Sequence, residues 1–297
     1  MTTQAIKDVV LCADDYALNA PVSQGIVALV VLGRLSATSV MSLSPRWAED
    51  AVALRDVRER LDVGVHLDWT SRFAIDAGHG SGLGAVMARA ALRLYKQKSI
   101  EDEIERQLDA FEAHWQAVPD HIDGHQHVQQ FAVFRHALAE VLMRRYGREA
   151  QRPWLRVSQV AQPGLKAKVI SAMGAHGLQQ WATQQNWPTV GPLLGAYGFD
   201  GSMDDYARHM QGWLAHLPQD KLAVIMCHPA VSAQSDDPIG TARKREFAYL
   251  AGHDFVQHMF DAGVRLVRGS GKPCCCCPAL AALTAASSGL AIMTMPG

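Results

Sequence analysis

The segment "DVVLCADDY" (residues 8–16) joins a continuous apolar run to two adjacent acids. From Val9 to Ala13 apolar and polar side chains do not alternate, which is typical of a strand buried on both faces, as in a parallel sheet. Asp14 and Asp15 stand where such a strand would end. In parallel α/β folds the reactive groups lie at the carboxyl ends of strands. This segment therefore predicts both a fold class and a functional position.

A strand–helix pattern continues through most of the chain. Strands are expected at 37–43, 61–67, 120–124, 154–158, 221–228 and 263–267, and helices at 20–33, 45–57, 86–97, 100–117 and 131–147. The glycine-rich segment 74–84 is expected to be a loop. Strands that alternate with helices favour an α/β fold, here an irregular (β/α) barrel of the TIM-like or NodB-like type in a single domain.

The end of the chain differs in composition from the rest. We expect one barrel domain over residues 1–270, followed by a low-complexity, poorly ordered tail over 271–297. The run Cys274–Cys277 lacks the spacing of zinc ligand pairs. The Ser, Thr, Gly and Pro content of the tail argues against a membrane anchor.

Composition excludes some partners. Hydrophobic residues make up 48% and charged residues 19% of the chain, which is ordinary for a soluble globular protein. A formal net charge of -1 gives no electrostatic reason to expect nucleic acid or an anionic membrane surface. Only Cys12 and Cys227 lie outside the cysteine run, and no signal-peptide pattern opens the chain, so the cytoplasm is expected. A homodimer is compatible with this composition, and stable membrane insertion is not expected.

Acids and histidines stand at four expected strand ends. They are Asp14, Asp15, His66, Asp123, His125 and His228. Because the carboxyl ends of parallel strands share one rim, we expect these side chains to converge. Two imidazoles and one carboxylate form a usual site for a divalent metal that keeps positions open for water and substrate. A second carboxylate could accept a proton from bound water, and a further histidine could protonate a leaving group.

Each of these residues also has a structural interpretation. The two acids could cap the following helix, since Asp accepts from free backbone N–H groups. His66 alone would fit a core histidine, and His228 before Pro229 would fit a turn. His121 shares a strand face with Asp123 and is interpreted as structural. Taken together, the structural interpretations require four coincidences, so the shared site is favoured.

Four segments in order carry a resemblance to a known family. They are "CADDYALN" (12–19), "GVHLDWT" (64–70), "HIDGHQHV" (121–128) and "MCHPA" (226–230). They resemble the YdjC family of carbohydrate deacetylases, the ChbG and HpnK group, over residues 8–268, and that family resembles the NodB-type polysaccharide deacetylases. The resemblance implies a metal-dependent hydrolase that removes the N-acetyl group from an amino sugar, either chitooligosaccharide-like or glycolipid-linked.

The resemblance also implies roles for individual residues. Asp15, His66 and His125 match the metal ligands, Asp14 the general base and His228 the general acid, although the two Asp roles could be exchanged. The implied cofactor is one divalent metal ion, Mg²⁺ or Zn²⁺, with Mn²⁺ or Co²⁺ as further options.

Four more residues are candidate supporting or substrate contacts. Asp123 is expected to orient a neighbouring imidazole. His127 is expected to support the site or to contact the substrate. Arg156 and Trp69 are candidate sugar or supporting contacts, because an aromatic face suits a pyranose ring.

Two departures from the family pattern concern backbone and ligands. The family usually reads "DDFG", whereas Ala17 stands at the glycine position here, so the turn is expected to hold unless it needs positive φ. Gln129 stands where the family often has a third histidine, which puts the role of that side chain in doubt.

Two other functions stay open. An amidohydrolase-like or phosphoesterase barrel also uses an H-x-H pair, but usually on its first strand, where this chain has the acid pair. A non-catalytic sugar-binding protein with a structural metal would not need both Asp14 and His228 beside the ligands.

Overall fold

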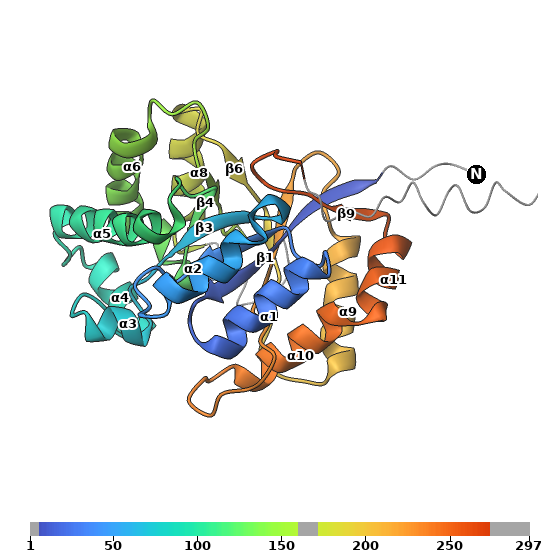
Figure 1. Ribbon diagram of the computed structural model, residues 1–297. Helices are drawn as coiled ribbons and strands as arrows, with labels where there is room; N and C mark the ends of the chain where they lie inside the picture. Colours follow the sequence, from blue (N-terminus) through green and yellow to red (C-terminus); the bar gives the residue numbers. More distant parts are fainter. Residues whose placement is uncertain (1–5, 160–171, 274–297) are drawn as a thin grey trace, which may run out of the picture.

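The computed structural model describes residues 6–159 and 172–273, which are coloured in Figure 1. The strands are β1 (Lys7–Tyr16), β2 (Ala37–Val40), β3 (Asp62–Leu67), β4 (His121–Gly124), β5 (Trp154–Arg156), β6 (Thr189–Val190), β7 (Leu193–Leu194), β8 (Ala223–Cys227) and β9 (Val264–Leu266). The helices are α1 (Ala20–Val31), α2 (Trp47–Arg55), α3 (Arg72–Asp76), α4 (Leu83–Ala91), α5 (Gln97–Trp115), α6 (Ala132–Tyr146), α8 (Ala175–Gln184), α9 (Met203–Ala215), α10 (Gly240–Ala251) and α11 (His253–Asp261), with 3-10 turns η1 (Arg58–Arg60) and η2 (His125–Gln130).

All strand pairs in the sheet are parallel, in the order β6-β5-β4-β3-β2-β1-β8-β7, and β9 pairs with β1. The two ends of this path, β6 and β7, follow each other directly in the sequence. β6 pairs with β5 at one end of the sheet, and β7 pairs with β8 at the other. The Leu193 N–H also donates to the Gln159 carbonyl at 2.9 Å. The sheet therefore curves into an irregular barrel with helices around it, as Figure 1 shows, which confirms the expected fold class.

The opening segment forms the centre of this sheet. β1 pairs with β2, β8 and β9, and residues Val9 to Ala13 are at most 1% exposed. The register with β2 shifts between Ala13 and Tyr16, and Asp15 there has a φ of 68°. This irregularity lies where the two acids are adjacent, so they are not held in the regular alternation of a strand.

The turn after β1 does need positive φ. Ala17 has a φ of 70°, a conformation that costs an L-residue roughly 1–2 kcal/mol and that glycine adopts freely. The Ala17 N–H donates to Ser23 Oγ at 3.1 Å, and the Ala17 carbonyl accepts from Ser44 Oγ at 2.6 Å. These bonds keep the turn without the glycine that the family usually has there.

Residues after β9 cover the amino-terminal end of the barrel. The Asp62 carboxylate, which is fully buried, accepts from Trp154 Nε1 at 3.0 Å, from Arg268 Nε at 2.9 Å and from the Ser270 N–H at 2.8 Å. Lys272 Nζ donates to Asp120 at 2.5 Å. Most of the predicted tail, residues 274–297 with its cysteine run, lies outside the described residues.

One expected loop contains helix. Segment 74–84 includes the end of α3 and the start of α4, so the prediction of a continuous loop is wrong there. Ser71 caps α3 by accepting from the Phe73 N–H at 3.1 Å, a signal that the surrounding glycines obscure. No helix among the described residues is long and apolar enough to cross a membrane.

Candidate active site

The predicted metal ligands come from three strand ends and lie together. Asp15 ends β1, His66 lies near the end of β3, and His125 follows β4. Asp15 Oδ1 is 3.4 Å from His66 Nε2 and 3.1 Å from His125 Nδ1. One donor atom from each residue lies within 4.8 Å of the other two, so the three residues could hold a single metal ion.

The donor set fits a divalent cation. His66 Nδ1 is 2.6 Å from Asp123 Oδ1, and this bond leaves Nε2 directed at Asp15. Burial alone lowers the pKa of His66, but the carboxylates of Asp123 and Asp14 outweigh it and raise the pKa to about 10. The site therefore favours a positive charge, and two imidazoles with one carboxylate are suitable ligands for a metal with open positions.

Asp14 is held by a buried guanidinium. Arg156 Nη1 and Nη2 donate to the two Asp14 oxygens at 2.6 and 2.9 Å, and Nη2 lies 3.1 Å from Asp123 Oδ2. Burial raises the pKa of Asp14, but Arg156 and then His66 act against it, and the net pKa is lowered. Asp14 is therefore ionised at neutral pH. Arg156, with no exposed surface, supports the site rather than contacting a sugar directly.

His228, the predicted general acid, lies next to Asp14. Its Nε2 is 3.9 Å from Asp14 Oδ2, and its backbone N–H donates to Glu246 Oε2 at 2.6 Å. Burial lowers the pKa of His228, and the carboxylates of Glu246, Asp14 and Asp15 oppose this effect without reversing it. The Phe199 ring and the imidazole form a T-shaped pair with a centroid distance of 5.2 Å.

The two histidines of the H-x-H pair, His125 and His127, both lie in turn η2 but face different surroundings. Gln126 and His127 have φ values of 53° and 62°, so the chain reverses its twist between them and β4. His125 is 20% exposed and faces Asp15, whereas His127 Nδ1 is paired with Ser158 Oγ at 3.1 Å. Burial lowers the pKa of His127 to about 3, so this side chain is neutral. His125 and His127 therefore serve different environments.

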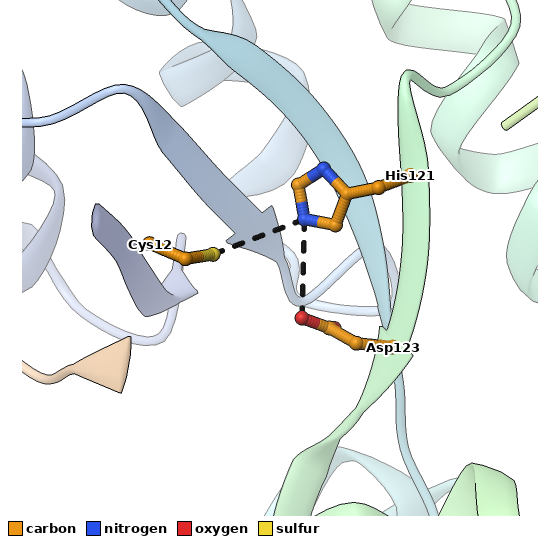
Figure 2. A group of neighbouring side chains, drawn as sticks. All are labelled: Cys12, His121 and Asp123. Carbon is orange, nitrogen blue, oxygen red and sulfur yellow. Dashed lines mark hydrogen bonds and ion pairs between the residues drawn. The ribbon is translucent and has the colours of Figure 1, made fainter. Parts of the chain in front are cut away.

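A second group of donors lies below the site. Figure 2 shows Cys12 and Asp123 directed at the same ring nitrogen of His121, with separations of 3.9 and 3.8 Å. The distances would allow a metal, but the Ser39 hydroxyl lies between these groups, 3.0 Å from His121 Nε2 and 2.6 Å from Asp123 Oδ2. The His121 ring also stacks on Trp154 at 4.3 Å. We interpret this group as a hydrogen-bond network that holds Asp123 beneath His66.

Trp69 does not lie where a sugar could stack on it. It is 2% exposed, and its ring packs edge-on against Phe134 at 4.8 Å and His79 at 5.8 Å. The expectation of a sugar platform is corrected here to a packing role, because neither ring face reaches the solvent.

Gln129, at the position of the family's third histidine, is also buried. Its Nε2 donates to the Arg156 carbonyl at 3.2 Å. In this chain the side chain supports β5, the strand that carries Arg156.

Two charged residues of the site were not expected from the sequence. Arg243 Nη2 donates to Asp15 Oδ2 at 2.7 Å, and Glu246 accepts from the His228 N–H. Both lie in "ARKREF" (242–247), where three consecutive basic residues followed by an acid resemble an exposed helix face. We find no local signal that would have marked them as buried.

The comparisons with known proteins bear on the fold and family. The sequence model of a family described as YdjC-like protein matches residues 8–259. No curated protein matches the chain. A solved structure from Enterococcus faecalis, provisionally named a cellobiose-phosphate cleavage protein, is 21% identical with a TM-score of 0.68, and the match covers 89% of this chain and 98% of that one. At that identity the likeness shows a shared fold.

Two further structures are more distant. A family 4 carbohydrate esterase from Streptomyces lividans, in complex with acetate, is 13% identical over 88% of this chain and 92% of that one, with a TM-score of 0.38. The Xyl-CE4 domain of a multidomain xylanase from the hindgut metagenome of Trinervitermes trinervoides is 10% identical over 89% and 88%, with a TM-score of 0.45.

Proposed function

We propose a function from one premise: this chain belongs to the YdjC-like protein family. The proposed activity is removal of the N-acetyl group from an N-acetylated amino sugar or oligosaccharide, chitooligosaccharide-like or glycolipid-linked, with one divalent cation as cofactor. One observation carries it: a suitable ligand set, Asp15 with His66 and His125, lies beside an ionised carboxylate, Asp14, and a third histidine, His228. A site that only binds a structural metal would not need these two neighbours.

The pairing of the two acids supports separate roles for them. Arg156 occupies both oxygens of Asp14, whereas Arg243 occupies only Oδ2 of Asp15 and leaves Oδ1 facing the two imidazoles. This difference supports the proposal that Asp15 is the ligand and Asp14 the proton acceptor, rather than the reverse.

A divalent cation bound at this site would polarise the acetyl carbonyl and lower the pKa of a bound water toward ~7. Asp14, ionised at neutral pH, would take the proton of the attacking water. His228 would protonate the departing amine. Because the pKa of His228 is lowered, its imidazole needs a proton during the reaction. Asp14, once it has taken the proton of the attacking water, can pass this proton to His228 Nε2 at 3.9 Å.

Asp123 and Arg156 act on these groups without contacting the substrate. Asp123 fixes the ring of His66 through Nδ1, and Arg156 fixes Asp14. We assign His127 to support of the β5 segment through Ser158. The donor set suits Zn²⁺ best, and with additional waters it would accept Mg²⁺, Mn²⁺ or Co²⁺.

We further propose that residues 1–270 form the catalytic domain and that it works in the cytoplasm. The two cysteines of the described chain, Cys12 and Cys227, are free thiols, as a reducing compartment requires. Sedimentation measurements would show whether the protein forms a homodimer.

The test is acetate release from N-acetylglucosamine oligomers of different lengths, with and without added Zn²⁺, Mg²⁺, Mn²⁺ or Co²⁺. We expect release that a chelator stops and added metal restores. His125→Ala should abolish metal binding, and Asp14→Asn should abolish turnover while metal still binds. Metal bound normally by the first variant would refute the ligand assignment, and full activity of the second would refute the role of Asp14.

The other two functions predict different results. An amidohydrolase-like or phosphoesterase enzyme would hydrolyse simple amides or phosphate esters and release no acetate from these sugars. A sugar-binding protein would bind the oligomers unchanged whether or not Asp14 is replaced.

A further inference from the structure

Helix α10 directs two buried charged side chains toward the site. Arg243 is 3% exposed and Glu246 is fully buried. Residues three apart lie on one face of a helix, so both side chains face the same side. A buried charge is costly unless it is paired or hydrogen-bonded, so the contacts of each residue indicate its role.

Arg243 links the predicted metal ligand to the loop before α10. Its Nη2 donates to Asp15 Oδ2 at 2.7 Å, and its Nε donates to Asp237 Oδ2 at 2.6 Å. Since Asp15 Oδ2 is held, the carboxylate cannot rotate freely, and Oδ1 stays directed at the imidazoles. Asp237 in turn fixes the guanidinium.

Glu246 holds the segment that carries His228. One carboxylate oxygen accepts from the His228 N–H at 2.6 Å, and the other accepts from the Tyr197 hydroxyl at 2.6 Å. In the described part of the chain no Arg or Lys forms a salt bridge with Glu246. Its contacts are therefore directed at the position of His228 rather than at the stability of an ion pair.

We propose that Arg243 and Glu246 are two positioning residues with separable effects: Arg243 orients Asp15 for the cation, and Glu246 holds His228 in place for proton transfer. The second half rests on the proposed function, and the first requires only that the site binds a cation. Neither residue contacts the reacting atoms.

The first test measures cation affinity by titration calorimetry with Zn²⁺ or Co²⁺. Arg243→Lys keeps the charge, but its single nitrogen cannot bridge Asp15 and Asp237 in the same way. We expect a 10–100-fold weaker affinity, the usual effect of losing a residue that orients a ligand. Asp237→Asn, which disturbs the guanidinium less, should give a smaller loss. Lys244→Met, exposed on the same helix, is the matched control and should leave affinity unchanged.

The second test separates binding from turnover. Glu246→Gln should keep cation affinity within about twofold but lower kcat by at least about tenfold, part of the 10²–10⁴ that acid–base catalysis contributes. Turnover by Arg243→Lys should recover at saturating metal, whereas turnover by Glu246→Gln should not. If α10 has only a general structural role, both variants should lose affinity, turnover and melting temperature together.

An NMR titration of His228 tests the Glu246 half without turnover. The charged groups that act on this imidazole are the carboxylates of Glu246, Asp14 and Asp15, which raise its pKa, and Arg243, which lowers it. Replacing Glu246 with Gln should therefore lower the pKa of His228. An unchanged pKa would overturn that half, and an unchanged affinity in folded Arg243→Lys or Asp237→Asn would overturn the other.

The outcomes also distinguish this inference from the proposed function. A wild-type protein that binds metal but releases no acetate refutes the deacetylase proposal, while the affinity series and the His228 titration still decide the roles of Arg243 and Glu246. A wild-type protein that binds no divalent metal refutes the metal site and the role of Arg243 together.

Discussion

Replacing Arg156 with Met should destabilise the protein by several kcal/mol. Arg156 has no exposed surface and donates to both oxygens of Asp14, so its removal leaves a buried carboxylate whose remaining positive neighbour is the His66 imidazole, 4.0 Å from Asp14 Oδ2. Breaking a buried pair in this way costs about 3–5 kcal/mol. Asp123 loses less, because His66 and Ser39 still contact it.

The magnitude has an upper bound that depends on pH. The unpaired Asp14 can avoid its charge by taking a proton, which from an ordinary pKa of about 3.9 costs about 4 kcal/mol at pH 7 and about 1.5 kcal/mol at pH 5. In the variant the folded-state pKa of Asp14 is raised, so stability falls as pH rises through that range. The loss relative to wild type should therefore be about 3–4 kcal/mol at pH 7 and at most about 1.5 kcal/mol at pH 5.

The assay is urea unfolding at both pH values, in the presence of a chelator, with the free energy extrapolated to water. Arg265→Met is a matched control, because Arg265 donates to both oxygens of Asp8 at 2.9 and 3.0 Å while the two side chains are 49% and 40% exposed. An exposed pair contributes about 0–1 kcal/mol. Asp14→Asn in the Arg156→Met background should recover most of the loss. A loss below about 1 kcal/mol at pH 7, or one that does not shrink at pH 5, would refute the reasoning.

Three further predictions concern the packing of glycines, the cap of α9 and metal binding. Gly64→Ala would place a Cβ 2.4 Å from the His121 ring and its carbonyl oxygen, so thermal unfolding should show a loss of about 3 kcal/mol or more; Gly212→Ala, in helix α9 with nothing within 4 Å, should gain about 0.5–1 kcal/mol. Hydrogen bonds from the Ser202 backbone and side chain lower the pKa of Asp205 to about 2, so the stability from this cap is present above pH ~4 and is lost as pH falls toward 2. Asp205→Asn should make the unfolding midpoint less dependent on pH over that range. An unchanged pH dependence would contradict the capping role. Zn²⁺ at 100 times its Kd should raise the free energy of unfolding by about 2.7 kcal/mol, a shift that EDTA reverses and that a protein without the metal site would not show.

The strands could be predicted because their local sequence pattern indicates burial on both faces. The run from Val9 to Ala13 is apolar without alternation, and that pattern has one common cause, burial on both faces. Once the sheet is parallel, the rim follows, and with it the proximity of Asp15 and His66 across an intervening strand. Family resemblance then added His125 rather than His127, a choice that spacing alone does not make.

The rest depends on tertiary contacts that the sequence does not encode locally. Arg243 and Glu246 have the spacing of an exposed ion pair, but both are buried in the fold, where α10 packs against α9, α11 and α1. The position of Trp69, two residues after β3, likewise does not show whether its ring is buried. A residue just after a strand can face the solvent or the core, and the helices that cover it decide between the two.

The two adjacent acids of the opening segment illustrate how one strand end can provide two chemically different carboxylates. Adjacent ionised groups in a buried site repel each other, and each needs its own cation. Arg156 reaches Asp14 from β5 and Arg243 reaches Asp15 from α10, so the two charges are balanced from different elements. The stoichiometry of hydrogen bonds then differs: both oxygens of Asp14 are engaged, and one oxygen of Asp15 is left for another cation. If this difference assigns the roles of the two acids, removing each arginine should affect a different property of the site. Arg243→Gln should free the second oxygen of Asp15 and weaken cation affinity, whereas Arg156→Met should leave affinity closer to wild type and act mainly on turnover and stability.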